Sequence, residues 1–100
     1  MIRGFRDKDT EEIFHRVRSR KLPDDIQQAA LRNLRMVNRA QTLKDLRVPP
    51  ANRLEKLTGD RAGQYSIRIN DQWRVCFVWR DNDAHEVEIV DYHQGASSHE

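Results

Sequence analysis

The chain has 100 residues, of which 37% are hydrophobic and 34% are charged, so a single domain with a modest core and a highly charged surface is expected. No apolar run reaches the roughly 18 residues of a membrane-spanning helix, and no membrane partner is expected. The N-terminal stretch MIRGFRDKD lacks the apolar segment of a secretion signal, and the single Cys76 can form no internal disulfide. These features predict a cytoplasmic protein.

Charge is distributed unevenly along the chain. Residues 1–48 contain twelve Lys/Arg and seven Asp/Glu, a net of +5, whereas residues 49–100 contain six and nine, a net of −3. Five of those six later bases lie between Arg53 and Arg74, and the acids are concentrated from Asp81 onward. Such focused positive charge suits a phosphate-bearing partner, although a solvated surface of mixed charge would have the same composition.

The N-terminal third predicts a short strand followed by a helix. MIRGF has the alternation of a strand. Asp9 with Glu12 resembles a capping box, so a helix is expected to begin near Thr10 and to end in the basic run RVRSRK. One face of this helix would carry Ile13, Phe14 and Val17.

A second helix is predicted after Leu22-Pro23, which ends the first one. Asp24 or Asp25 is expected to cap it. Its buried stripe is expected to contain Ile26, Ala29, Ala30, Leu34 and Val37, with Arg32, Arg35 and Arg39 largely outside it. After this helix, TLKDL could form one short turn before Pro49-Pro50.

The second half predicts an antiparallel meander. A basic, glycine-containing loop at 50–64 could include a short strand at 53–57, and strands are expected at 64–70, 73–80 and 85–93. The order gives an α+β domain with the N-terminal strand and two helices packed on one face of a mainly antiparallel sheet. We expect one domain over residues 1–93 and a frayed tail over 94–100.

The stretch YSIRINDQWRVCF predicts a β-hairpin whose register raises a question. If Asn70, Asp71 and Gln72 form a three-residue loop, all large apolar residues fall on one face and Arg68 lies directly opposite Arg74. Opposed like charges destabilise a strand pair by up to about 1 kcal/mol. An anion bound between the arginines would explain them, and removing Arg74 would then leave stability unchanged or raise it.

A candidate site for phosphodiester chemistry surrounds this arginine pair. Arginine forks match phosphate oxygens, Tyr92 could stack on an unpaired base, and His93, at the end of the last strand, could move a proton. Arg53, Lys56 and Arg61 from the loop could add RNA contacts. These groups suit attack of a ribose 2′-hydroxyl on its own phosphate, for which no metal or other cofactor is expected.

Structural roles for the same residues stay open from the sequence alone. Arg68 and Arg74 could form ion pairs with Glu86, Glu88 or Asp91 on neighbouring strands, and Tyr92 could be an aromatic residue at the edge of the core. The remaining large aromatics, Trp73, Phe77 and Trp79, are expected in the core.

The stretch NRLEKLTGDRAGQYSIRINDQWRVCFVW, with VEIVDYH, resembles the HigB-type branch of the RelE/ParE toxin superfamily, and is most similar to its GraT-like members. The similarity covers most of the chain and is strong from Pro49 to His93. Matching features include Pro49-Pro50, Asn52-Arg53-Leu54, Gly59-Asp60-Arg61, Gly63-Gln64, Asn70-Asp71-Gln72-Trp73-Arg74 and Asp91-Tyr92-His93.

This resemblance implies a RelE-like fold and the toxin of a type II toxin–antitoxin system. Such a toxin is a ribosome-dependent, metal-independent endoribonuclease that cuts mRNA and inhibits translation. The implied partners are a co-encoded helix-turn-helix (HigA-like) antitoxin, the ribosome and mRNA, with operator DNA bound only through the antitoxin. The implied catalytic residues are Arg74, Asp91, Tyr92 and His93, with Gln64 among the RNA contacts.

Two positions depart from the pattern of this family. HigB-type enzymes commonly have a histidine where this chain has Glu55 and a lysine where it has Thr58. Either Glu55 or His93 could then be the base or the acid. Two other functions stay open: a ParE-like gyrase inhibitor, and a non-catalytic basic domain that binds an antitoxin.

Overall fold

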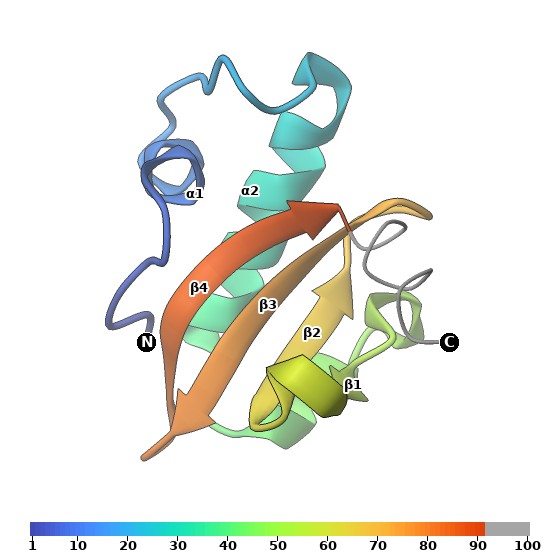
Figure 1. Cartoon of the computed structure of the whole chain (residues 1–100). Coiled ribbons are helices and arrows are strands. Elements are labelled where there is room, and N and C mark those ends of the chain that lie inside the picture. The colour runs from blue at the N-terminus through green and yellow to red at the C-terminus, as the bar shows by residue number, and fades with distance from the viewer. Residues whose placement is uncertain (92–100) are drawn as a thin grey trace.

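The computed structural model describes residues 1–91 and shows an α+β fold, as expected (Figure 1). Four strands form one antiparallel sheet in the order β1-β2-β3-β4. Within the described residues, no helix is long and apolar enough to span a membrane. The elements are α1 (Lys8–Phe14), α2 (Asp24–Arg39), the 3-10 helices η1 (Leu43–Arg47), η2 (Pro50–Asn52) and η3 (Gly59–Arg61), and the strands β1 (Glu55–Lys56), β2 (Gln64–Arg68), β3 (Trp73–Arg80) and β4 (Asp83–Asp91).

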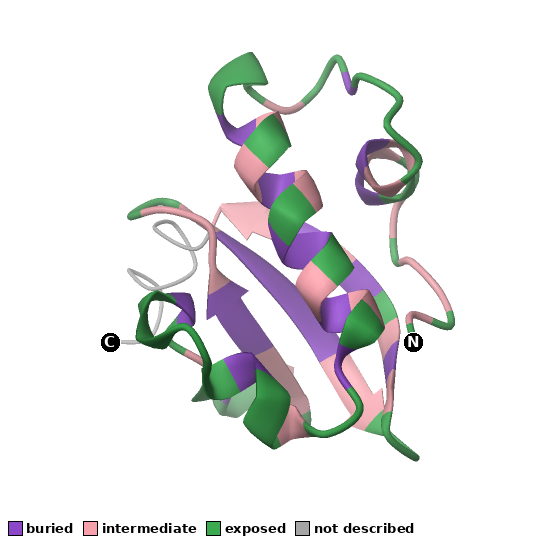
Figure 2. Cartoon of the chain, turned by 180° about the vertical axis from the view of Figure 1, so that it is seen from behind, coloured by how far each residue is buried: buried purple, intermediate pink, exposed green. Residues whose placement is uncertain are grey.

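The core lies between α2 and the sheet, where the apolar stripe of the helix meets alternate residues of the strands (Figure 2). The predicted stripe is largely confirmed, except that Ala29 is only half-buried and Asn33 is buried in its place. The three arginines of α2 are exposed, as predicted. Fully buried core side chains include Leu34, Val37, Leu46, Ile67, Val75, Phe77 and Val87.

The buried Asn33 connects the helix to the hairpin. Its side-chain amide donates a hydrogen bond of 2.9 Å to the carbonyl oxygen of Arg68. The amide thereby satisfies a backbone acceptor at the end of β2, where the ladder stops. This bond fixes the backbone of a predicted site residue against the helix.

The N-terminal segment forms no regular strand, contrary to expectation. Ile2 and Phe5 make isolated parallel bridges to Ala84 and Val87 of β4. The segment is nevertheless held along the outer edge of the sheet, because the terminal amino group and Arg3 both pair with Asp83.

The bounds predicted for the first helix were wrong. It begins at Lys8 and is capped by Asp7, whose carboxylate accepts a 2.7 Å bond from the Thr10 amide. It ends at Phe14, and Arg16 takes a left-handed conformation with φ of 64° that turns the chain away. Val17 is therefore exposed rather than part of the apolar face.

The second helix begins where the sequence predicts, but without a side-chain cap. Pro23 occupies the N-cap position, and neither Asp24 nor Asp25 forms the capping bond.

The short turn predicted at TLKDL is confirmed as η1, and its capping box is formed by Thr42 and Asp45. Bonds from the Gln41 and Thr42 amides hold the pKa of Asp45 below its ordinary value.

The predicted hairpin register is confirmed. Arg68 pairs with Arg74, Ile67 pairs with Val75, and the backbone amide of Ile69 donates to the carbonyl of Trp73 at 2.9 Å. The Asn70 side chain closes the loop, because its oxygen accepts 2.8 Å bonds from two backbone amides.

The last strand starts earlier than the sequence predicts. β4 begins at Asp83, so only Asp81 and Asn82 make the preceding turn, both with positive φ. Positions 92 and 93 of the predicted strand, and the predicted boundary between domain and tail, lie outside the described residues.

Candidate functional site

Arg74 is a buried arginine held in a fixed orientation. It is 6% exposed, and its Nε donates to the Ser66 hydroxyl at 2.8 Å. One terminal nitrogen donates to the Arg53 carbonyl at 2.5 Å and lies 4.0 Å from a carboxylate oxygen of Glu55. A guanidinium with several fixed acceptors keeps its charge and its direction, which is what recognition of a phosphate requires.

Arg68 lies directly across the strand pair but is less tightly held. About a third of its side chain is exposed, and it forms an ion pair with Asp71 of the hairpin loop. The Asp71 side chain is 98% exposed, so water solvates the carboxylate of this pair. An exposed pair of this kind contributes only about 0–1 kcal/mol, and an anion of higher charge can replace it.

The two arginines open into one hollow of about 460 Å³ on the sheet face opposite the helices. We call it the arginine hollow. Three arginines and two acidic residues line it. The lining residues are Ala51, Arg53, Glu55, Arg68, Asn70, Asp71 and Arg74.

Arg53 enters the arginine hollow from a strained stretch of backbone. It follows η2 with φ of 45°, a left-handed conformation that costs an ordinary residue about 1–2 kcal/mol. The buried Asn52 side chain holds the preceding turn through a 3.1 Å bond to the Leu46 carbonyl. The strained turn directs the Arg53 carbonyl toward Arg74, and such strain is common at functional sites.

Three of the predicted RNA contacts lie outside the arginine hollow. Arg61 donates to Glu88 at 2.8 Å and to Gln64 at 3.0 Å, so this arginine and this amide form a local network. Lys56 follows Glu55 on β1 and lines a different depression, beside Tyr65. The structure thus brings together Arg53, Glu55, Arg68 and Arg74 among the predicted site residues.

The last strand brings Asp91 to the hairpin loop. Asp91 pairs with Trp73 in the β3–β4 ladder, and its carboxylate accepts a 3.0 Å hydrogen bond from the side-chain amide of Gln72. It is not among the residues that line the arginine hollow. Tyr92 and His93, which the sequence places directly after it, lie outside the described residues.

Two of the β4 carboxylates considered as partners of the arginine pair, Glu86 and Glu88, form ion pairs elsewhere. Arg6 lies 3.2 Å from Glu86, and Arg61 and Arg6 both approach Glu88. The ion pairs found for Arg68 and Arg74 involve Asp71 and Glu55 instead. Both of those acids line the arginine hollow, so they lie where a bound anion would lie.

Sequence reasoning missed Ser66 and underestimated Asp71. Ser66 is fully buried two residues before Arg68, on the same face, and its hydroxyl orients Arg74. The strand period placed Ser66 on that face, so a polar residue two positions from an arginine was the available signal. Asp71 was interpreted only as a turn former, although it also neutralises Arg68.

Residues 1–91 offer neither a reactive cysteine nor a cluster of metal-binding side chains as a second site. Burial raises the pKa of the Cys76 thiol to about 11, so it stays protonated and unreactive at neutral pH. No group of three or more His, Cys, Asp or Glu side chains within this range is placed to hold a metal ion.

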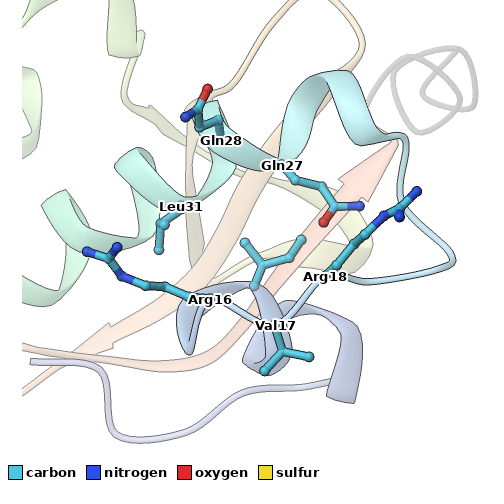
Figure 3. Close-up of a pocket in the computed structure, with 7 residues that line it drawn as sticks. Arg16, Val17, Arg18, Gln27, Gln28 and Leu31 are labelled. Carbon is cyan, nitrogen blue, oxygen red and sulfur yellow. The ribbon is translucent and has the colours of Figure 1, made fainter.

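A smaller depression, of about 280 Å³, lies on the helical side between the end of α1 and α2 (Figure 3). Several of its polar side chains are engaged in hydrogen bonds and an ion pair that hold neighbouring segments together. The Gln27 amide donates to the carbonyls of Ser19 and Leu22, and Arg18 pairs with Asp24 at 2.6 Å. We therefore place the candidate site at the arginine hollow.

Comparison with known proteins identifies the family. Residues 3–93 match the model of the RelE-like toxin of the type II toxin–antitoxin system HigB. Toxin HigB-1 of Vibrio cholerae is 42% identical over 84% of this chain and 90% of its own length. Endoribonuclease HigB of Proteus vulgaris is 27% identical over 93% of this chain and all of its own length.

A solved structure agrees with the fold. A chain of the YoeB–YefM complex from Staphylococcus aureus superposes with a TM-score of 0.55 at 17% identity, over 88% of this chain and 95% of that one. The sequence resemblance and the fold class are thus both confirmed. The chain belongs to the HigB-like family of RelE-like toxins of type II toxin–antitoxin systems.

Proposed function

We propose that the protein is an endoribonuclease that cleaves mRNA on the ribosome, with its active site in the arginine hollow. The observation that carries this proposal is the convergence of Arg53, Arg68 and Arg74 in one hollow beside the carboxylate of Glu55. Three guanidinium groups suit the doubly charged phosphorus centre that develops when a ribose hydroxyl attacks its phosphate. The name of the Proteus vulgaris relative, an endoribonuclease, supports the same activity.

In the proposed mechanism the chain's own side chains move the protons. A base removes the proton of the 2′-hydroxyl, whose oxygen attacks the adjacent phosphorus. The bond from phosphorus to the 5′-oxygen breaks, and an acid protonates that oxygen, leaving a 2′,3′-cyclic phosphate and a 5′-hydroxyl. We assign the base to Glu55 and the acid to His93. Arg74 and Arg68 stabilise the phosphorane, and Asp91 and Tyr92 help to position the RNA.

The proposed partners follow from the family and from charge. A co-encoded antitoxin would hold such a toxin inactive, and the basic N-terminal half would attract an acidic surface on it. With mRNA on ribosomes as its substrate, the protein would act in the cytoplasm. Operator DNA would be contacted through the antitoxin.

Toeprinting of translating ribosomes tests this function directly. The protein is added to a programmed translation reaction, and reverse transcription maps new mRNA ends. We expect ends at codons in the ribosomal A site, and we expect none with the Arg68→Gln/Arg74→Lys double variant. A ParE-like activity would instead give gyrase-linked DNA breaks without new mRNA ends. Absence of both, with a stable antitoxin complex, would indicate a non-catalytic binding domain.

A further inference from the structure

A second cationic hollow lies beside β1 and belongs to no site described above. It has a volume of about 520 Å³. We call it the edge hollow, because β1 is one of the two edge strands of the sheet. Its lining residues come from η1, from residues 54–56 and from β2; they are Leu43, Lys44, Arg47, Leu54, Lys56 and Tyr65.

The edge hollow and the arginine hollow lie on opposite sides of one stretch of backbone. Arg53 and Glu55 line the arginine hollow, whereas Leu54 and Lys56 line the edge hollow. For the adjacent β1 residues Glu55 and Lys56, this assignment follows the alternation of side chains along a strand. A flexible chain that crosses the edge of the sheet at β1 could therefore contact both hollows.

Among the residues that the structure describes, the cations of the edge hollow have no carboxylate partner. Lys44, Arg47 and Lys56 are exposed, and none makes an ion pair or a side-chain hydrogen bond with another residue of the described range 1–91. By contrast, Arg61 and Arg68 each have a carboxylate partner. Three unneutralised cations around one depression attract an anionic ligand.

The floor of the edge hollow is apolar and aromatic. Tyr65 is half-buried, and its ring stacks on Phe77 with centroids 6.4 Å apart, so the ring is held in place. Leu43 and Leu54 are half-buried beside it. A fixed ring with cations around it is the arrangement that binds single-stranded nucleic acid, because bases stack on aromatic faces while cations hold phosphates.

We propose that the edge hollow is a second RNA subsite, which binds a nucleotide flanking the one that is cleaved. The base lies against Tyr65 and the two leucines, and the neighbouring phosphates contact Lys44, Arg47 and Lys56. This inference rests on the proposed function, because it assigns the edge hollow to the same RNA strand as the arginine hollow.

The test measures binding of a short single-stranded RNA with 2′-O-methyl groups, which cannot be cleaved, by fluorescence anisotropy over a series of salt concentrations. Each phosphate contact to a single strand contributes about 0.7 to the slope of log affinity against log salt. The K44Q/R47Q/K56Q variant is expected to lower the magnitude of that slope by about 2. Tyr65→Leu should weaken binding about tenfold, while Tyr65→Phe should keep it.

A matched triple variant controls for net charge. R32Q/R35Q/R39Q removes three cations from the exposed face of α2 and is expected to leave the slope nearly unchanged. Equal slopes in the two triple variants would overturn the proposal, since they would reflect long-range attraction only. Normal RNA binding by the edge variants with loss of the antitoxin complex would overturn it in favour of a protein surface.

The two proposals can fail separately. If the wild type produces no new mRNA ends on ribosomes, the proposed endoribonuclease fails, yet a reduced slope in the edge variants would still support an RNA subsite. If cleavage depends on Arg74, but neither Tyr65→Leu nor K44Q/R47Q/K56Q changes the RNA affinity or the salt slope, only the proposed subsite fails.

Discussion

Arg68 and Arg74 lie directly opposite each other on β2 and β3, but only Arg74 is buried. Its guanidinium is fixed by Ser66 and by the Arg53 carbonyl, whereas that of Arg68 reaches out to an exposed carboxylate. Local acceptors thus offset the repulsion expected between opposed like charges. One arginine is fixed in place, and the other has a partner that an anion can replace.

The first prediction concerns Arg74. Arg74→Ala should lower the free energy of unfolding by about 1–3 kcal/mol, because the buried Ser66 hydroxyl and the Arg53 carbonyl lose their donor. This reverses the expectation from sequence that stability would be unchanged or raised. Urea unfolding measures it, and an unchanged midpoint with an unchanged slope would show that these hydrogen bonds contribute nothing net.

The second prediction concerns Asp71, which competes with substrate phosphate for Arg68. Asp71→Asn should raise affinity for the uncleavable RNA about two- to fivefold at low salt, because an exposed ion pair contributes at most about 1 kcal/mol. The gain should shrink as salt screens the interaction. It should also disappear in an Arg68→Gln background, which a double-mutant cycle measures.

Asp81→Asn is the matched control for that substitution. Asp81 is an exposed aspartate in the other hairpin turn, and Asn tolerates its positive φ of 55°. It removes the same charge away from the arginine hollow. An equal gain in RNA affinity from both variants would mean that net charge, and not competition for Arg68, sets the effect.

Most of the fold and the hairpin register could be predicted because they depend on short-range patterns. The alternation from Tyr65 to Phe77 permits one register that places every large apolar residue on one face, and the structure has that register. The stripe of α2 likewise follows from its spacing. The family motifs then placed Glu55 and Arg74 in one site.

The parts that could not be predicted depend on competing caps and on long-range partners. Asp7 and Asp9 are both good capping residues, and only the fold shows that Asp9 is engaged instead by the Ser19 hydroxyl at 2.8 Å. The pairing of Arg61 with Glu88 joins residues 27 positions apart, which no local pattern encodes. Lys56 was predicted to contact RNA together with Arg53, but nothing in the sequence indicated that it lines a separate hollow.

The third prediction concerns Asp83, which forms ion pairs with the N-terminal amino group and with Arg3. Bonds from Arg3 and from the terminal amino group hold the pKa of Asp83 below its ordinary value. A carboxylate of lowered pKa stabilises the fold above its unfolded pKa, and the effect is lost as the pH falls through the lowered value. Asp83→Asn should therefore reduce stability at pH 7, and the difference should shrink as the pH falls below the ordinary pKa of an aspartate.

Urea unfolding of both proteins at several pH values checks this dependence. Asp81→Asn serves again as the comparison, because Asp81 has no ion pair within residues 1–91. A stability difference for Asp83→Asn that persists unchanged at low pH would show that the side chain acts through packing and not through its charge.

The last prediction assigns the proton transfers. General acid–base groups contribute about 10²- to 10⁴-fold, so His93→Gln and Glu55→Gln should each slow cleavage at least tenfold. Glu55 is half-exposed, 4.0 Å from Arg74, so Glu55→Gln should fold normally. Both variants are expected to bind the ribosome still. Single-turnover cleavage of mRNA on programmed ribosomes measures the rates. Wild-type rates in His93→Gln with a large loss in Glu55→Gln would move the proton chemistry to Glu55, and the reverse result would move it to His93. Wild-type rates in both variants would leave catalysis to positioning and to the arginines alone.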